Sequence, residues 1–172
     1  MLVFKDMPAD AAEGLAPLVA TGTLFSFRSL PGTRLLLPAG GFQPYLGALA
    51  SRHRHNLTKK LKGGTRVCPL ESSVASELDE QTLSEVVGLY SQTYEKSNLK
   101  FERMPRAFFR LAAGLECASY LLLRDRSTGN LVAFMLCFRL GGRVINKFIG
   151  LDYTLPREGF VYYQLWRDAV EW

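Results

Sequence analysis

The sequence predicts an α+β fold in which a mostly antiparallel sheet is flanked by helices. Three apolar segments, 119–124, 131–138 and 143–149, follow one another too closely for crossover helices, so they should pair as antiparallel hairpins. The next segment, 159–172, changes period, and its apolar residues form one wide helical face. From residue 65 the expected order is strand, helix, helix, strand, strand, strand, helix, which is typical of an α+β domain.

Length and composition indicate a soluble globular protein with one sizeable core. Of the 172 residues, 48% are hydrophobic and 22% are charged, which are ordinary values. No apolar run reaches the roughly 20 residues needed to span a bilayer, and the N-terminus lacks the pattern of a secretory signal. Cys68, Cys117 and Cys137 lack metal-ligand spacing, and we expect buried thiols in a reducing compartment. These features predict a cytoplasmic protein without a metal site.

The net charge of +5 comes from one segment, 52–62, which holds five Lys and Arg residues and no acid. The other sixteen basic residues balance the sixteen acidic ones. Such a segment can contact phosphates of tRNA or of a nucleotide-linked substrate, or dock on an acidic membrane; a solvated helix face is the alternative. The expected phosphate-binding or substrate-binding residues are Arg52, Arg54, Asn56, Lys59 and Lys60.

The first seventy residues are expected to form short elements and one long helix. In order, these are a weak helix over 9–20, short strands at Leu24–Arg28 and Arg34–Leu37, a helix over 42–62 and a strand over 65–70. A Leu-Pro-Gly-Thr sequence supplies the turn between the two short strands. The apolar spacing predicts the long helix, and Gly63-Gly64 is expected to end it.

Residues 79–115 are predicted to form two further helices. Asp79 is a suitable N-cap for a helix over 80–96, whose apolar residues recur at helical spacing. Pro105 suits the first turn of a helix over 105–115. Between the last two strands, Gly141-Gly142 is a strong signal for a two-residue hairpin turn.

The element order and three local stretches resemble the GNAT acyltransferase fold over roughly residues 35–172. The stretches are Ser51–Leu61, Leu89–Tyr94 continuing to Phe101 and Phe108-Phe109, and Phe148–Tyr153 before the last helix. More narrowly, they are similar to Fem-type and cellulose-biosynthesis-type acetyltransferases. This resemblance implies a GNAT-like, largely antiparallel sheet flanked by helices. It also implies transfer of an acyl or aminoacyl group to an amine of a cell-envelope or polysaccharide precursor.

The resemblance implies acyl-CoA or aminoacyl-tRNA as the donor, without a metal. In GNAT proteins the strand matching 143–150 offers backbone groups to the pantetheine arm, and the next helix N-terminus holds the pyrophosphate. Unpaired first-turn N–H groups and the helix dipole favour an anion there. Pro156–Val161 has a single glycine where the usual signature is Arg/Gln-x-x-Gly-x-Gly/Ala; Fem-type relatives also lack that signature. The implied cofactor-binding residues are Ile149, Gly150, Arg157, Gly159 and Phe160.

Acyl transfer to an amine needs a group that takes a proton and a donor to the leaving group. Asp152 and Tyr153, at the end of the last predicted strand, are the first candidates. Glu102 is the next, because it precedes Pro105 in a loop whose counterpart in relatives lies over the acceptor. An alternative is that Asp152 caps a turn and that Pro156 and Gly159 only start a helix.

The expected domain organisation is an N-terminal segment over 1–40, resembling the tail of a preceding GNAT-like half, and a GNAT-like domain over 41–172. The last helix reaches Trp172 without a stop signal, and the strand that follows this helix in GNAT-like domains is missing. We therefore expect a domain truncated at its C-terminal end. The strand at 143–150 is then a sheet edge open to homodimer formation.

Two other functions stay open. Helix 42–62 can serve a non-catalytic module that binds nucleic acid or an anionic membrane, and the chain can be an inactive remnant. The expected partners are an amine-bearing envelope or polysaccharide precursor, tRNA, the inner face of the membrane as a peripheral contact, and a second copy of the chain.

Overall fold

The computed structural model describes residues 9–26, 32–100 and 103–172, and the chain divides into two compact units, 1–36 and 37–172. The described part of the first unit contains two short helices, α1 (Ala9–Gly14) and α2 (Ala16–Ala20).

The helix predicted over 9–20 is therefore interrupted at Leu15. The interruption coincides with Pro17 in the first turn of α2, whose ring nitrogen has no hydrogen to continue α1. Both short predicted strands are wrong where the chain is described, because residues 24–26 and 34–37 adopt no strand. The remainder of the first, 27–28, lies outside the described residues.

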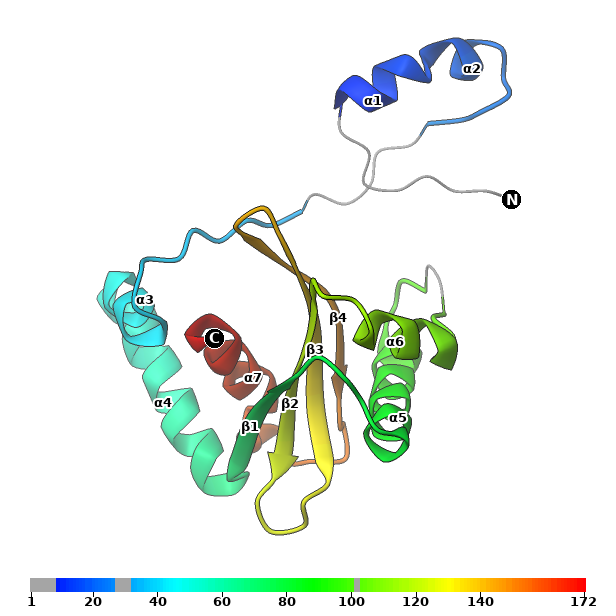
Figure 1. Ribbon diagram of the computed structural model, residues 1–172. Coiled ribbons are helices and arrows are strands. Elements are labelled where there is room, and N and C mark those ends of the chain that lie inside the picture. Colours follow the sequence, from blue (N-terminus) through cyan, green and yellow to red (C-terminus); the bar gives the residue numbers. More distant parts are fainter. Residues whose placement is uncertain (1–8, 27–31, 101–102) are drawn as a thin grey trace. The chain divides into compact units, whose positions relative to one another are not determined.

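The second unit is built on a four-stranded sheet in which every neighbouring pair is antiparallel (Figure 1). Its order follows the chain: β1 (Leu70–Ala75), β2 (Ala118–Asp125), β3 (Leu131–Leu140) and β4 (Arg143–Leu151). The three closely spaced strands of the sequence prediction are confirmed as consecutive hairpins. Gly141 and Gly142 turn the last hairpin with φ values of 53° and 74°, which side chains with a Cβ rarely adopt.

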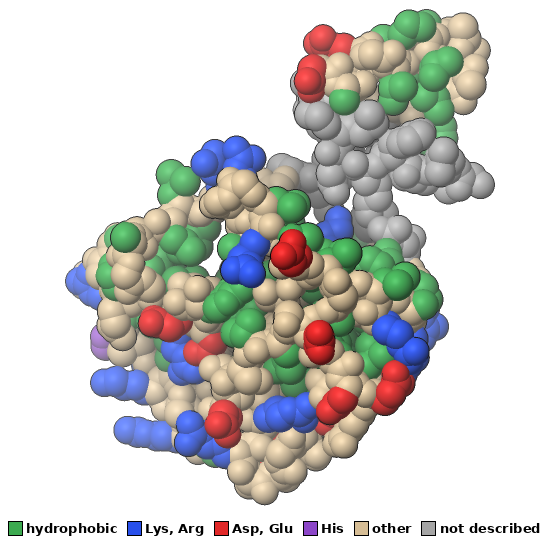
Figure 2. Space-filling model, viewed as in Figure 1, with side chains coloured by type: hydrophobic (Ala, Val, Ile, Leu, Met, Phe, Trp, Pro, Cys, Tyr) green, Lys and Arg blue, Asp and Glu red, His purple; other side chains and the backbone are tan. Residues whose placement is uncertain are grey.

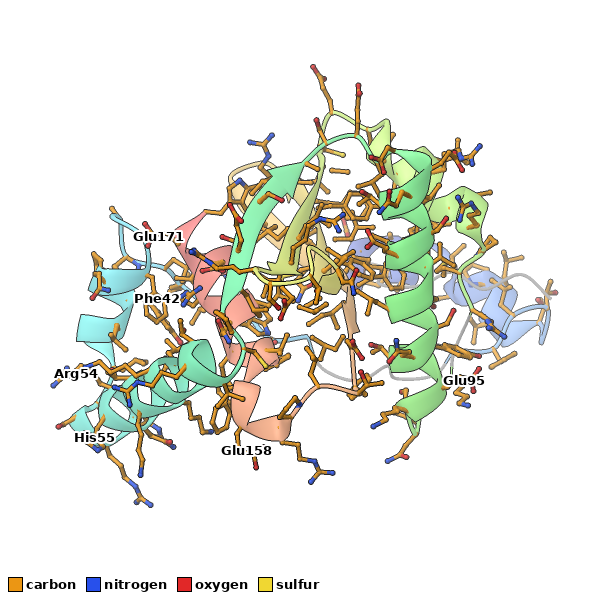
Figure 3. All side chains as sticks on the ribbon, turned by 90° about the horizontal axis from the view of Figure 1, so that it is seen from below. Phe42, Arg54, His55, Glu95, Glu158 and Glu171 are labelled. Atoms are coloured by element: carbon orange, nitrogen blue, oxygen red, sulfur yellow. The ribbon has the colours of Figure 1, made fainter. Side chains whose placement is uncertain are left out.

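Two layers of helices cover the sheet (Figure 1). α5 (Glu80–Lys96) and α6 (Arg106–Ala113) lie on one face, and α4 (Ser51–Val67) and α7 (Val161–Glu171) lie on the other. α3 (Phe42–Ala48) precedes α4. Its start is joined to the end of α7, because Glu171 Oε2 accepts a 2.8 Å hydrogen bond from the Phe42 backbone N–H (Figure 3).

The single helix predicted over 42–62 is wrong, since α3 and α4 are separated by an extended backbone at Leu49. The Arg54 guanidinium stabilises this break by donating to the carbonyls of Gly47 and Leu49, at 3.0 and 3.1 Å. α4 then continues through Gly63-Gly64 to Val67. The strand predicted over 65–70 is therefore also wrong, and β1 begins only at Leu70.

The predictions for residues 79–115 hold more closely. Asp79 caps α5, because its Oδ1 accepts from the Thr82 backbone N–H at 2.7 Å. Pro105 occupies the N-cap position of α6, immediately before the first turn in which it was expected.

The α5/α6 face of the sheet is filled by large aromatic side chains. Phe109, Tyr120 and Phe134 are fully buried and form edge or tilted ring contacts with one another or with neighbouring rings. The Tyr120 hydroxyl donates to the Phe109 carbonyl at 2.8 Å, and burial raises the pKa of this phenol well above its usual range.

The α4/α7 face is filled by smaller side chains, among them Cys68, Ala133, Cys137 and Leu165. The thiols of Cys68 and Cys137 are buried as predicted, whereas Cys117 is half-buried. Among the described helices, none is long and apolar enough to cross a membrane.

Candidate functional site

The start of α7 presents two backbone N–H groups that have no hydrogen-bond partner among the described residues. A short 3₁₀ turn, η1 (Arg157–Gly159), leads into Phe160, whose φ of 44° and ψ of 40° lie in the left-handed region. The Phe160 N–H donates to the Arg157 carbonyl at 3.1 Å. The next two N–H groups, of Val161 and Tyr162, have no acceptor among the described residues. A left-handed residue followed by helical ones turns successive N–H groups toward one point, which favours an anion.

A cation from α4 lies beside this helix start. Lys60 Nζ donates to the Tyr163 hydroxyl at 2.8 Å and lies 4.2 Å from the centre of that ring and 5.9 Å from the centre of the Phe160 ring. Two groups that the sequence predicted separately, the basic helix and the helix N-terminus, therefore meet at Lys60 and Phe160. Glu158 is exposed in the turn before Phe160 and brings one negative charge near the same place.

Close backbone packing and one buried amide hold the junction between α4 and α7. A Cβ on Gly64 would come within 2.5 Å of the Gly159 carbonyl oxygen, and one on Gly159 within 2.5 Å of the Cys68 sulfur. Gln164 is 1% exposed, and its Nε2 donates to the carbonyls of Gly159 and Cys68 at 2.8 and 3.1 Å. Gly159 is therefore buried within the junction. The N–H groups of Val161 and Tyr162, which have no acceptor among the described residues, follow it at the start of α7.

The β4 strand has one edge on which no strand is paired among the described residues. The Asp152 N–H donates to the Val132 carbonyl at 2.8 Å. The alternation of an antiparallel ladder then directs the backbone of Gly150 toward β3 and that of Ile149 toward the open edge. Gly150 has a packing role as well, because its Cβ would meet the Phe134 ring and the Leu89 backbone of α5.

The three predicted catalytic residues have different surroundings. Asp152 Oδ1 accepts from the N–H and the hydroxyl of Thr154, at 2.9 and 2.7 Å, so the carboxylate does close a turn. The Tyr153 ring is 38% exposed and packs under Lys96 Nζ, which lies 4.3 Å from its centre. Glu102 lies outside the described residues.

The residues predicted to bind phosphate divide into two groups. Arg54 and Lys60 make the interhelical contacts described above. Arg52, Asn56 and Lys59 are exposed, and no contact of their side chains is found within the described residues. Arg157, predicted at the cofactor, is also exposed.

Sequence reasoning missed Gln164 and Tyr163. Gln164 had a weak signal, since it is a polar residue three positions after Val161 and next to Leu165, both of which face the core. Tyr163 had none, because its role depends on Lys60, which is 103 positions away in the chain.

Comparisons with known proteins agree with this architecture. The family model described as "Acetyltransferase (GNAT) domain" matches residues 51–171. Among solved structures, the chain is similar to L-PGS from Bacillus licheniformis, with a TM-score of 0.50 and 16% sequence identity. The match covers 72% of this chain and 39% of that one, and at this low sequence identity it shows the fold alone. A search of the curated proteins found no match.

The four-stranded antiparallel sheet between two helical layers, with α7 beginning just beyond β4, defines an α+β domain. The family match covers most of the chain, and the chain belongs to the acetyltransferase (GNAT) domain family. The GNAT-like fold class predicted from the sequence is thus confirmed. The narrower Fem-type or cellulose-biosynthesis-type branch stays a prediction.

Proposed function

We propose that this chain is the donor-binding part of an N-acyltransferase. It holds the phosphates of an acyl carrier, acyl-CoA or aminoacyl-tRNA, at the start of α7. It transfers the acyl or aminoacyl group to an amine of a cell-envelope or polysaccharide precursor.

One observation carries this proposal: the unpaired N–H groups of Val161 and Tyr162 lie at the start of a helix beside the Lys60 ammonium. The N–H groups, the helix dipole and the cation all favour negative charge at one place. Tyr163 holds the Lys60 ammonium in place. The two hydrogen bonds that Gln164 donates to the carbonyls of Gly159 and Cys68, here called the Gln164 clamp, hold the helix start. Both are in place before a ligand arrives, which lowers the ordering cost of binding. Arg157 is exposed next to the site and can reach the same phosphates.

The open edge of β4 supplies the second part of the donor site. A pantetheine arm carries amide groups, and the outward N–H and C=O of Ile149 can pair with them as a neighbouring strand would. Leu151 N–H, the next outward donor, is already bonded to Thr93 Oγ1 at 3.1 Å. The pairing therefore ends at Ile149, and the carrier reaches the start of α7 beyond it.

In the proposed reaction the acceptor amine attacks the carbonyl carbon of the donor thioester or ester. A C–N bond forms, and the C–S or C–O bond to the carrier breaks. The amine proton passes to the Asp152 carboxylate, whose Oδ2 is not engaged by the Thr154 contacts that hold Oδ1. The exposed Tyr153 hydroxyl returns a proton to the leaving group, and Glu102 is the alternative base.

The acceptor and the location of the enzyme follow from the same proposal. An envelope or polysaccharide precursor places the reaction in the cytoplasm, at the inner face of the membrane. The open β4 edge also allows pairing with a second copy of the chain. The branch of the family decides between acyl-CoA and tRNA as carrier.

Calorimetric titration with acetyl-CoA, and separately with a non-hydrolysable aminoacyl-tRNA, tests the proposal. Replacing Lys60 by Met removes a charge-assisted contact worth about 1.5–3 kcal/mol, so binding should weaken on the order of 10-fold to 100-fold. The matched control is Arg143→Met, which removes one exposed positive charge at the start of β4. Lack of binding by both carriers, or equal losses in the two variants, contradicts the proposed donor site.

A further inference from the structure

Five basic side chains lie in a narrow band along the outer side of α4. Arg52, His55, Lys59, Lys62 and Arg66 are separated by three, four, three and four residues, and all five are exposed. A mean spacing of 3.5 residues keeps them on one side of a helix, and a rise of 1.5 Å per residue makes the band about 21 Å long. We call these five residues the basic stripe. His55, labelled in Figure 3, lies on the side of α4 away from α7.

The described part of the fold makes no polar contact with the side chains of the basic stripe. Among the described residues, no carboxylate lies within ion-pair distance of any of its members, and none makes a side-chain hydrogen bond. The two other cations of α4, Arg54 and Lys60, do make such contacts. Figure 2 shows Lys and Arg side chains projecting into solvent along the edge of the molecule that α4 forms.

The basic stripe lowers the stability of the helix that carries it. The N-cap of α4 is Ala50, which offers no side-chain acceptor, and the first turn has no acid. Arg52 is therefore a cation at the positive end of the helix dipole, and the like charges of Lys59, Lys62 and Arg66, which lie three and four residues apart, add repulsion. Outside α4 the chain has 15 basic and 16 acidic residues, so the uncompensated charge is local. An unfavourable feature without a structural gain is expected where a ligand supplies the missing partner.

We propose that the basic stripe binds the phosphodiester backbone of a nucleic acid, without reading its sequence. A band one charge wide fits a strand with one negative charge at every nucleotide, and neutralising those phosphates releases counterions. Every exposed side chain from Arg52 to Arg66 is polar, so the surface offers phosphate contacts and no aromatic platform for bases.

An anionic membrane fits this surface less well. A helix that lies on a bilayer buries an apolar face between the lipid headgroups. Among the large apolar side chains of α4, Leu57 is half-buried and Leu61 is buried. Val67 is exposed, but it is a single side chain at the last position of the helix and does not form an apolar face. The inference does not rest on the proposed acyl transfer, since a strand can bind here whether or not the chain transfers an acyl group.

Fluorescence anisotropy with a labelled, unstructured oligouridine tests the inference across a range of salt concentrations. Arg52→Gln/Lys59→Gln removes two phosphate contacts. This should lower the slope of log K against log salt by about 1.4, and weaken binding on the order of 50-fold near about 50 mM salt. The matched control, Arg34→Gln/Arg143→Gln, removes two exposed cations elsewhere and should leave the slope unchanged. Circular dichroism melting establishes that each variant is folded.

Three results overturn the inference. The unchanged chain fails to bind the oligouridine at low salt, or the control variant loses as much affinity as the stripe variant, which assigns binding to net charge. The third is sedimentation with vesicles of anionic phospholipid that depends on Arg52 and Lys59 while oligouridine binding does not. A stripe-dependent salt slope without vesicle binding supports the inference.

Discussion

The two faces of the sheet are built by different means. The α5/α6 face has large rings in mutual contact, a side-chain N-cap at Asp79 and a partly buried ion pair between Arg124 and Glu85 at 2.9 Å. The α4/α7 face has smaller side chains, two glycines in backbone contact and a left-handed Phe160. Neither α4 nor α7 has a side-chain N-cap. On the first face α6 also begins without a side-chain cap, so the clearest departure from local rules is the left-handed Phe160, which lies on the second face.

This difference indicates which face of the sheet can hold a functional site. A left-handed phenylalanine and uncapped helix starts each cost stability, and they persist only where the surrounding structure supports them. The aromatic face supplies that support through the shared strands β2 and β3, which contribute side chains to both faces. The proposed donor site and the basic stripe both lie on the α4/α7 face.

The largest expected effect is the loss of a ring from the aromatic face. Phe109 is fully buried and contacts the rings of Tyr90, Phe134 and Phe148. Phe109→Ala should lower the free energy of unfolding by about 3–5 kcal/mol, through lost transfer energy and a cavity. Urea denaturation measures it, with Leu165→Ala as the counterpart on the α4/α7 face. A larger loss of unfolding free energy for Leu165→Ala would mean that the α4/α7 face, and not the aromatic face, contributes more to stability.

The next effect separates two adjacent glycines of α4. A Cβ at Gly64 would meet the Gly159 carbonyl, so Gly64→Ala should destabilise by about 1–3 kcal/mol through overpacking. A Cβ at Gly63 would meet no atom within 4 Å, so Gly63→Ala should stabilise by about 0.5–1 kcal/mol through helix propensity. Thermal melting of both variants measures the difference.

The glycine pair also tests the donor site. Gly64→Ala pushes Gly159 away from α4 and should weaken acetyl-CoA binding, whereas Gly63→Ala should leave it unchanged. Equal stability changes for the two variants would mean that α4 and α7 do not approach as closely as described.

A smaller effect concerns the cap of α5 and its dependence on pH. The hydrogen bond from the Thr82 backbone N–H holds the pKa of Asp79 below its usual value of 3.8. A lowered pKa in the folded state means that the carboxylate stabilises the fold above its usual pKa, and that this contribution is lost as the pH falls through the folded value. Asp79→Ala should therefore lower the melting temperature by a few degrees at neutral pH, and the difference should close in acid.

The conservative variant separates charge from capping. Asp79→Asn keeps an acceptor for the Thr82 N–H, so it should retain most of the stability at neutral pH and lose the acid dependence. A difference between Asp79→Ala and the unchanged chain that persists at the lowest pH would contradict this account.

The sequence predicted what depends on local periodicity. The strands β2, β3 and β4 follow from short apolar segments and glycine turns, and α5 follows from its cap and apolar spacing. Gly63-Gly64 was misread as a helix end, because a glycine that ends a helix and one that admits another backbone look alike in sequence. Only the position of Gly159, 95 residues later, distinguishes them.

The candidate site was predicted in outline for the same reason. The basic segment and the start of the last helix each have a local signal, so Lys60 and Phe160 were both selected. Their meeting through Tyr163, and the Gln164 clamp, depend on how α4 packs against α7. That packing is a tertiary property without a periodic signal in either segment.

The smallest expected effect is a reaction rate that reports how firmly the α4/α7 face is closed. Burial, aided by the negative charge of Asp125, raises the pKa of the Cys68 thiol, and burial raises that of Cys137 to about 11. The thiolate is the group that attacks a disulfide reagent, so half-buried Cys117 should react first in the native chain. Cys68 lies against Gly159, and its thiol becomes accessible when α7 separates from α4.

If the α4/α7 face is the less stable one, Cys68 should react through a partial opening whose rate depends less on urea than global unfolding does. Gly64→Ala should accelerate that reaction, and Phe109→Ala should act only through global stability. Mass spectrometry of the labelled peptides at increasing urea measures each rate. If Cys68 reacts only through global unfolding, the two faces open together, and the contrast between them concerns composition alone.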